Sequence, residues 1–405
     1  MTQIVKIGKI STQIRGVSYS KNDAILKKED GYLPVLRANN IQEQGLFLKD
    51  FVYIPESKIS NKQKILIGDV VIAASSGSIN LVGKAASAKE NINAGFGAFC
   101  KILRPNIELV DPRYFANYFQ TQKYRQIISN LAAGANINNL KNEHLDDLEI
   151  PLPPLSEQRR IASILDQADA LRQKRQQAIQ KLDQLLQATF IDMFGDPVSN
   201  PKGWDIKKLK ELSTKIHSGN TPKGGAENYV DQGIVFLRSQ NVWKNKVILE
   251  DVAYIDAETH AKMMKSSVKH EDLLMTKTGR INTENSSLGR AAIYLGKDDS
   301  ANINGHVYLI RIKDGFNKYF ILRILTLPDY YEYIRSVCVG GIDKRQLNKE
   351  HIENFPIIQP PMELQNKFFD IVQVIESQKP KLVEQLELAE NLFRTLQNQA
   401  FNGTL

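Results

Sequence analysis

The sequence contains one unit of about 200 residues written twice, and this repeat constrains the fold more than any other feature. Residues 35–54 (VLRANNIQEQGLFLKDFVYI) match residues 236–255 (FLRSQNVWKNKVILEDVAYI) at an offset of 201 positions. Residues 139–154 match residues 346–361 at an offset of 207 positions. Because the offset drifts by only a few positions along the chain, we interpret the sequence as a tandem duplication of a whole domain.

Each copy begins with short β-branched and aromatic runs separated by Gly, Asn and Asp, which is the pattern of strands and turns. Strands are expected at residues 33–38, 51–54, 69–74 and 99–103, and in the second copy at 234–239, 252–255, 272–276 and 307–312. A helix is expected next, over residues 112–132 and 317–337. The prediction is an α+β protein with two tandem globular domains, residues 1–152 and 198–359.

A long helix is expected after each domain, within residues 153–197 and 360–405. Apolar residues recur there every three or four positions, and the two helices share the heptad phase, as in a coiled coil. The first helix would span roughly 57 Å at about 1.5 Å per residue. Pro380 should kink or break the second helix, because proline removes a backbone donor. The expected packing seam comprises Ile161, Ile164, Ala168, Leu171, Leu182, Leu185, Phe368, Ile371, Ile375, Leu382, Leu386 and Leu392.

The positive charge lies in the two domains and not in the helices. Residues 1–150 and residues 199–357 each carry a net charge of +5, out of +8 for the whole chain. Excess positive charge suits a polyanionic partner. The two cysteines are too few for a disulfide framework or a zinc knuckle. No apolar run is long enough for a membrane span, and no signal peptide is evident, so we expect a cytoplasmic protein without a membrane partner.

We find no catalytic motif in the sequence. Phosphate-cradling glycine loops, a nucleophile elbow and metal-ligand histidine pairs are all missing from it, so no catalytic residue and no metal ligand is predicted. A nuclease-like pattern can be drawn through Asp50, Glu56 and Lys58. The repeat undermines this pattern, because Thr259 stands where the second copy would need the lysine.

Polar loops of each domain supply groups that can hydrogen-bond to base edges or to phosphates, with Arg suited to guanine and Asn or Gln to adenine. In the first copy the candidates are Arg37, Asn39, Asn40, Ser75, Ser76, Ser78, Asn80, Lys84, Asn136, Asn138, Lys141 and Asn142. In the second copy they are Arg238, Ser239, Gln240, Asn241, Lys277, Thr278, Arg280, Asn282, Arg290, Lys344 and Arg345. These loops differ between the copies while the framework matches, which would let one scaffold read two different DNA sequences.

Three segments resemble the specificity subunits of type I restriction–modification enzymes: PLPPLSEQRRIASILDQADAL, MFGDPVSNPKGWDIKKL and the terminal AFNGTL. The resemblance covers the whole chain. It rests on Pro153, Pro154, Glu157, Gln158 and Ile161, matched in the second copy by Pro360, Pro361, Gln365 and Phe368. The second copy departs from the pattern where Leu364 replaces the glutamate.

The resemblance implies two target recognition domains, each reading half of a split DNA site, and two spacer helices that form an antiparallel coiled coil. It implies a non-catalytic subunit that binds double-stranded DNA, two modification (methyltransferase) subunits and two restriction subunits. No cofactor is expected on this chain, whereas S-adenosylmethionine, ATP and Mg would belong to the partner subunits. The half-site centres should lie about one helical turn apart, roughly 10 base pairs. Two alternatives stay open: a standalone bivalent DNA-binding protein and a nuclease.

Overall fold

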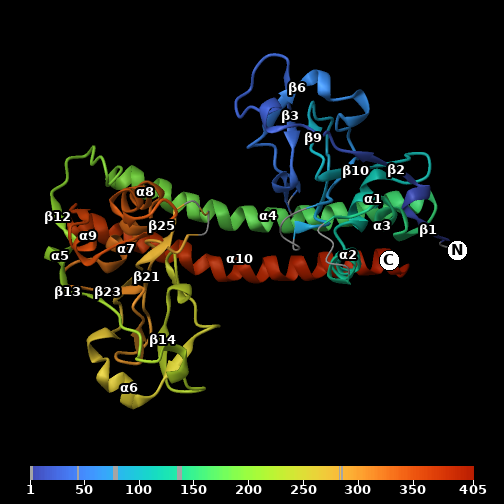
Figure 1. Cartoon of the computed structure of the whole chain (residues 1–405). Helices are drawn as coiled ribbons and strands as arrows, with labels where there is room; N and C mark the ends of the chain where they lie inside the picture. The colour runs from blue at the N-terminus through green and yellow to red at the C-terminus, as the bar shows by residue number, and fades with distance from the viewer. Residues whose placement is uncertain (1–2, 43–44, 76–80, 135–138, 282, 284–285) are drawn as a thin grey trace. The chain divides into compact units, whose positions relative to one another are not determined.

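The computed structural model describes residues 3–42, 45–75, 81–134, 139–281, 283 and 286–405. The chain divides into two compact units. The first unit comprises residues Met1–Ala178 and Lys381–Leu405, and the second comprises Ile179–Pro380. Each unit therefore contains one globular part together with a portion of each long helix, and the elements of both are labelled in Figure 1.

Both units build the same four-stranded antiparallel sheet from equivalent strands. In the first unit its order is β2 (Ser11–Arg15), β10 (Cys100–Pro105), β7 (Val70–Ala73) and β8 (Ala85–Ser87). In the second unit its order is β13 (Ser213–Ser218), β23 (Val307–Ile312), β19 (Leu273–Thr276) and β21 (Ala291–Ile293). The structure thus confirms the duplication that the sequence predicts.

Each unit also has a second sheet, in which one strand has a parallel neighbour on one side and an antiparallel neighbour on the other. The first unit has β6 (Val52–Pro55), β3 (Tyr32–Leu36) and β9 (Gly95–Phe96). The second unit has β17 (Ala253–Ile255), β14 (Ile234–Leu237), β22 (Ala301–Ile303) and β18 (Ser267–Val268). The eight expected strands all correspond to observed strands of these sheets.

Short strand pairs complete each unit. In the first unit they are β1 (Gln3–Lys6) with β11 (Glu149–Leu152), and β4 (Ile41–Gln42) with β5 (Gly45–Leu46). In the second unit they are β12 (Ile206–Lys208) with β26 (Pro356–Ile358), and β15 (Val242–Trp243) with β16 (Lys246–Val247). A three-stranded sheet also joins β20 (Thr278–Arg280), β25 (Lys344–Gln346) and β24 (Val339–Gly340).

The helices between the sheets and the long helices are shorter than the sequence predicts. The expected helix over residues 112–132 is two helices, α1 (Pro112–Tyr118) and α2 (Gln122–Gly134). The expected helix over residues 317–337 is also two, α7 (Lys318–Thr326) and α8 (Pro328–Val337), because Pro328 occupies the first position of a new helix. The remaining short helices are α3 (Asn142–Asp146), α5 (Leu209–Leu212), α6 (Ala257–Lys262) and α9 (Lys349–Glu353).

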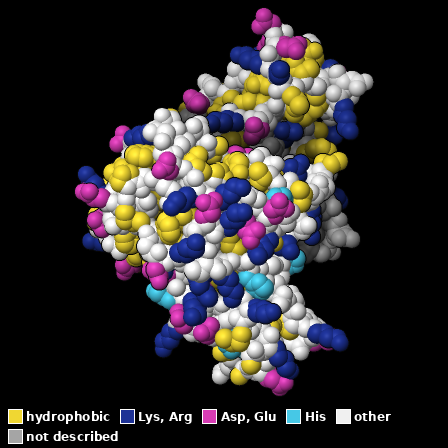
Figure 2. Space-filling view, turned by 90° about the vertical axis from the view of Figure 1, so that its left-hand side faces the viewer, with side chains coloured by type: hydrophobic (Ala, Val, Ile, Leu, Met, Phe, Trp, Pro, Cys, Tyr) yellow, Lys and Arg dark blue, Asp and Glu magenta, His cyan; other side chains and the backbone are white. Residues whose placement is uncertain are grey.

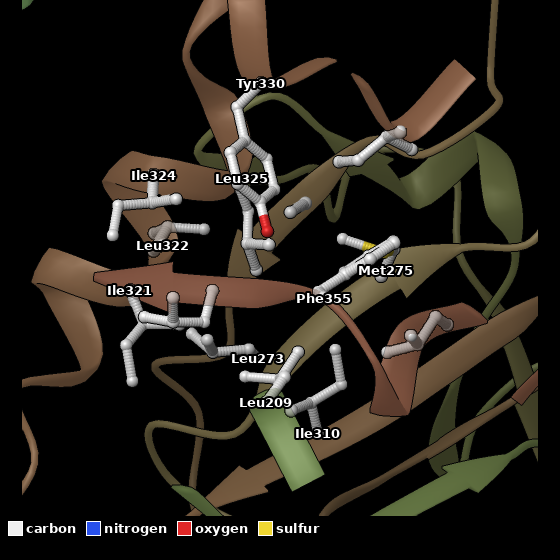
Figure 3. Close-up of a cluster of buried hydrophobic side chains, with 14 of the residues drawn as sticks. Leu209, Leu273, Met275, Ile310, Ile321, Leu322, Ile324, Leu325, Tyr330 and Phe355 are labelled. Carbon is white, nitrogen blue, oxygen red and sulfur yellow. The ribbon is translucent and has the colours of Figure 1, made fainter. Parts of the chain in front are cut away.

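The main hydrophobic core of the second unit packs α7 and α8 against one face of its antiparallel sheet. Leu273, Met275 and Ile310 come from the sheet, and Ile321, Ile324 and Tyr330 come from the two helices (Figure 3). The first unit has an equivalent core on its own sheet, with Tyr114, Phe115, Tyr118 and Tyr124 from α1 and α2. The helices thereby cover one face of the sheet, and the other face packs in a second core against the neighbouring sheet, as Leu274 and Leu309 do with Leu237 and Ile303.

The two long helices are α4 (Leu155–Phe194) and α10 (Met362–Asn402). In the first unit, Ile161 and Leu165 near the start of α4 share a core with Phe393 and Phe401 near the end of α10. In the second unit, the end of α4 packs on the start of α10, where the Phe194 and Phe368 rings lie 5.5 Å apart. The helices are therefore antiparallel within each unit, as expected.

Helix α10 continues through Pro380, so the predicted break at this residue is not present. Pro380 is exposed, and Glu376, whose carbonyl group loses its helical donor, is exposed as well. Water can bond to that carbonyl group. Packing of Ile375 before the proline and of Ala389 after it, both buried, holds the helix on either side.

The packing seam of the long helices differs by one position from the expected seam at several sites. Leu165 and Leu186 are fully buried, whereas the predicted Leu171 and Leu185 are 38% and 50% exposed. In α10, Phe393 is buried and the predicted Leu392 is 47% exposed. Among the other predicted seam residues, those that are buried or half-buried are Ile161, Ile164, Ala168, Leu182, Phe368, Ile371, Ile375, Leu382 and Leu386.

Charged side chains occupy the middle of the seam. Arg172 is half-buried, with its guanidinium 5.0 Å from the centre of the Phe393 ring and 2.6 Å from Asp169. The equivalent residue in α10 is Lys379, which bonds to Asp183 at 2.6 Å and to Glu376 at 2.7 Å. The long aliphatic stems of these residues can line a seam while their charged ends reach a carboxylate.

A buried ion pair links the residue before one strand to the neighbouring strand at the same place in both units. Asp69 is fully buried and accepts two hydrogen bonds from Arg104, both 2.8 Å long. Asp272 is 2% exposed and accepts two from Arg311, at 2.8 and 2.7 Å. Such bidentate carboxylate–guanidinium contacts have a specific geometry and thereby hold the start of one strand against its neighbour.

Replacing Asp272 with Asn should lower the free energy of unfolding by about 2 kcal/mol, because it leaves the Arg311 charge without its ionic partner. The loss stays below the roughly 3–5 kcal/mol of a fully buried pair, since the Arg311 side chain is 25% exposed. Urea denaturation of the full chain measures it. The control is Asp314→Asn at an exposed position, where we expect a change within about 0.5 kcal/mol. An equal loss in both variants would contradict the assignment.

Candidate functional site

The first polar stretch of each unit forms the same tight turn. Asn40 and Asn241 are buried, and each accepts a 2.9 Å hydrogen bond from the backbone N–H of Arg37 or Arg238. Each asparagine also donates to two loop carbonyl groups. Arg37 and Arg238 in turn donate to the carbonyl group of the aspartate thirteen residues later. The geometry therefore gives these four side chains a role in holding the turn.

Three predicted residues of these turns lie at the surface. Asn39 and Gln240 are exposed, and Ser239 is half-buried. The Gln240 side-chain amide donates to the Asp251 carboxylate at 2.9 Å, which leaves its carbonyl oxygen as an acceptor. Asn39 and Gln240 are therefore the exposed predicted side chains of the first stretch.

The second and third polar stretches meet in both units. In the first unit Ser75 pairs with Asn139 in an isolated β-bridge, and the Leu140 N–H donates to the Ala74 carbonyl at 2.7 Å. In the second unit the equivalent pairing is longer: β20 and β25 align Thr278 with Gln346 and Arg280 with Lys344. Two loops that are about 65 residues apart in the sequence thus form one surface in each unit.

The β24–β25 hairpin makes this surface strongly basic in the second unit. Arg280 is 69% exposed at the end of β20, and Lys344 is exposed beside it. Asp343 is the acidic residue of the hairpin and lies 3.4 Å from Arg280. The Arg345 side chain is half-buried, and its Nε atom has no hydrogen-bond partner among the described residues. The hairpin and the adjoining strand therefore carry three cationic residues and one acidic residue, and the described ion pair is between Arg280 and Asp343.

This arrangement differs from the face of the second unit that carries α5 and α9. Figure 2 looks onto the end of the chain that carries α5 and α9, where Lys and Arg side chains alternate with Asp and Glu side chains. Charge therefore does not mark this face as a binding face. The hairpin and the end of β20 are a better candidate for a binding surface, because Arg280, Lys344 and Arg345 outnumber the one aspartate there.

In the second unit the first polar stretch also reaches this surface, through Trp243. The Trp243 indole N–H donates to the Gln240 carbonyl at 3.1 Å. The Arg290 guanidinium lies 3.8 Å from the centre of the Trp243 ring, and its Nε atom donates to the Ser286 carbonyl at 2.8 Å. Burial lowers the pKa of Arg290, but arginine stays protonated in proteins.

A cavity of about 350 Å³ opens beside Trp243. Its walls include the rings of Trp243 and Tyr331 and the cationic groups of Lys244, Lys246 and Arg290, and no carboxylate belongs to the lining that the structure describes. The Lys244 ammonium lies 4.5 Å from the centre of the Tyr331 ring. Aromatic rings among cations suit a ligand that is both anionic and planar, such as a nucleotide.

The sequence analysis missed the residues of this cavity other than Arg290. The signal was available in the segment VWKNK, where an aromatic residue stands among lysines while the first copy has Gln42 and Gly45 at the positions of Trp243 and Lys246. Tyr331 carries no such signal, because it lies in a helix with ordinary amphipathic spacing.

Most of the other predicted residues that the structure describes have local contacts. Lys84 is half-buried, Lys141 lies 3.5 Å from Glu143, and Asn142 accepts a 2.8 Å hydrogen bond from Lys101. The Lys277 ammonium is 5.8 Å from the Tyr308 ring centre, and the Thr278 hydroxyl is 3.4 Å from the His306 imidazole. Six predicted residues lie outside the described part of the chain: Ser76, Ser78, Asn80, Asn136, Asn138 and Asn282.

The nuclease-like pattern does not assemble. Lys58 pairs with Asp23 at 2.6 Å, and this contact holds the pKa of the Asp23 carboxyl at about 2. Glu56 pairs with Lys64 at 3.0 Å. Within the described residues there is no group of three or more His, Cys, Asp or Glu side chains placed to hold a metal ion, and no helix there is long and apolar enough to span a membrane.

The family model described as the type I restriction modification DNA specificity domain matches this chain twice, at residues 2–181 and 201–388. The chain belongs to this family. The two matches coincide with the two copies of the repeat, and specificity subunits of this family recognise DNA sequences and are generally not catalytic.

Two specificity subunits of type I restriction enzymes are similar to this chain along almost its whole length. The EcoKI specificity subunit of Escherichia coli is 30% identical over 421 residues, covering 99% of this chain and 89% of that protein. The StySPI specificity subunit of Salmonella potsdam is 29% identical over 417 residues, covering 98% and 88%.

Solved structures of type I systems share the fold of this specificity subunit. The S subunit of a type I restriction-modification system from M. genitalium has a TM-score of 0.52 at 17% identity, covering 99% of this chain and 96% of that one. A chain from a study of complex assembly and conformational transition of the type I R-M system also has a TM-score of 0.52 at 17% identity, covering 100% and 98%.

Proposed function

We propose that this chain reads a bipartite, asymmetric DNA site, one half with each globular part, and brings adenine-N6 methyltransferase subunits to it. One observation carries the proposal. The same framework joins two polar stretches in both units, yet the side chains at the junction differ, with Ser75 and Asn139 in the first unit and Thr278–Arg280 and Lys344–Gln346 in the second. Equal scaffolds with unequal polar surfaces suit two different half-sites.

In this proposal, residues 1–152 and 198–359 are the recognition domains, and residues 153–197 and 360–405 are the spacers that set the half-site separation. Two modification subunits and two restriction subunits complete the assembly. S-adenosylmethionine, ATP and Mg belong to those partners, and the complex works on double-stranded DNA in the cytoplasm. The half-site centres lie roughly 10 base pairs apart, one turn of the duplex.

Genome-wide mapping of N6-methyladenine in cells with and without this gene tests the proposal. We expect one gapped, asymmetric motif to lose its methylation when the gene is deleted. A motif that is continuous or perfectly palindromic would contradict the assignment of one half-site to each domain. If no motif changes and no methyltransferase copurifies with the chain, a standalone DNA-binding protein is the better interpretation.

The cavity beside Trp243 supplies a phosphate-binding group in this proposal. Changing Lys244 and Lys246 together to Ala should reduce the slope of log binding constant against log salt concentration by about 1 to 2 units, because each lysine–phosphate contact releases about one counterion. Binding titrations at several salt concentrations measure the slope. Lys297→Ala is the control, since Lys297 is exposed beyond the opposite end of β21. An unchanged slope in the double variant would mean that Lys244 and Lys246 do not contact the DNA phosphates.

A further inference from the structure

The tip of the β24–β25 hairpin presents an isoleucine to solvent. Ile342 is 90% exposed, the highest value among the large hydrophobic side chains that the structure describes. Gly340, the last residue of β24, has a φ of +138°, and a Cβ atom there would lie 2.7 Å from the Lys344 carbonyl oxygen of the facing strand. This close approach requires glycine at position 340, and Ile342 lies in the short loop that follows, at the end of the hairpin.

The surroundings of Ile342 are cationic. Arg280, Lys344 and Arg345 lie on the two strands next to the tip, where Arg280 aligns with Lys344 and Gly279 with Arg345. Asp343 follows the isoleucine and pairs with Arg280. An apolar side chain with cationic residues on the adjoining strands does not suit an apolar protein groove, because those cations would lose their hydration without gaining partners. It suits a polyanion that also offers an apolar group.

The width of the hairpin indicates which groove of a DNA duplex it could enter. Neighbouring strands lie about 4.8 Å apart, and side chains widen the ribbon further. The minor groove of B-DNA is only about 6 Å wide, whereas the major groove, about 12 Å wide, admits a two-stranded ribbon. On the major-groove edges of the bases the exposed apolar group is the 5-methyl group of thymine.

We propose that Ile342 packs on the 5-methyl group of a thymine in the half-site read by the second unit. The inference rests on the proposed function and assigns one base contact within it. Arg280 and Lys344 reach the flanking base edges or phosphates. At the offset of 207 the first copy has Ala135 in place of the isoleucine, so this contact belongs to the second half-site and adds to the asymmetry of the whole site.

Replacing thymine with uracil, one position at a time, tests the contact, because uracil pairs identically and lacks only the methyl group. The full chain, in complex with its modification subunits, is titrated with duplexes carrying the methylation motif. We expect uracil at one thymine of the second half-site to weaken binding about fourfold, the ratio that burial of one methyl-sized group gives. The Ile342→Ala variant should bind the thymine duplex about fourfold more weakly and should lose its preference for thymine at that position.

Leu295→Ala is the matched control. Leu295 is a 60% exposed aliphatic residue that follows β21 and is not part of the β24–β25 hairpin. The variant should keep both the affinity and the thymine preference. The proposal is overturned if the second half-site contains no thymine, if no uracil substitution weakens binding, or if Ile342→Ala retains the preference. Failure of the proposed function gives a different result, because the wild-type complex would then bind the motif no better than unrelated DNA.

Discussion

A chain in which Arg280, Lys344 and Arg345 are all changed to Ala should bind its DNA target about 1000-fold more weakly than the wild type. A contact of such a side chain with a base edge contributes about 1–3 kcal/mol. Three contacts of about 1.4 kcal/mol each give a factor of about 1000. Arg280 is already held by Asp343 at 3.4 Å, so the carboxylate is released when the arginine is removed and repels the phosphates. Competition binding with the motif and with unrelated DNA measures the loss.

The pattern of the loss separates recognition from simple charge. The triple variant should become insensitive to base changes in the second half-site and keep its sensitivity to changes in the first. The matched control changes Lys210, Lys265 and Lys297 to Ala, which removes the same charge from exposed positions elsewhere in the second unit. A control that binds as weakly as the hairpin variant would show that only net charge acts. Circular dichroism of both variants checks that they remain folded.

The polar stretches illustrate what the sequence could predict about the site. Composition alone placed candidate residues in three stretches of each copy, and the structure joins the second and third of them through the Ser75–Asn139 bridge and the β20–β25 pairing. Composition could not distinguish Asn241, whose side-chain amide is hydrogen-bonded inside a turn, from Gln240 at the surface. The hydrogen-bond partners of Asn241 lie up to ten residues away, so its burial depends on the loop conformation and not on residue type.

The framework was more predictable than the site. Strand positions follow from short runs of β-branched residues, and the repeat provides each prediction twice. The seam of the long helices was harder, because adjacent apolar residues such as Ile164 and Leu165 leave the heptad phase open by one position. Steps of exactly three and four through Ile161, Leu165 and Ala168 lead next to Arg172 and Arg175, which are half-buried. A search for apolar residues alone passes over these arginines and chooses Leu171 instead.

Adjacent residues in the two helices provide the sharpest test of this seam. Leu186→Ala should lower the free energy of unfolding by about 3 kcal/mol, because the side chain is fully buried and its removal leaves a cavity. Leu185→Ala should change it by less than about 0.5 kcal/mol, since half of that side chain is already exposed. Urea denaturation of the full chain, compared at the transition midpoint, measures both.

Helix α10 repeats the test at the equivalent positions. Phe393→Ala should cost about 3 kcal/mol, because the ring is 7% exposed and supports the Arg172 guanidinium, whereas Leu392→Ala at 47% exposure should be nearly neutral. The opposite ranking in either helix would restore the seam expected from the sequence. Equal losses of stability within a pair would mean that both adjacent side chains are buried. The helices would then pack on a wider face than the one that the structure buries. The measurement thus decides, for two helices at once, between phases that differ by a single residue.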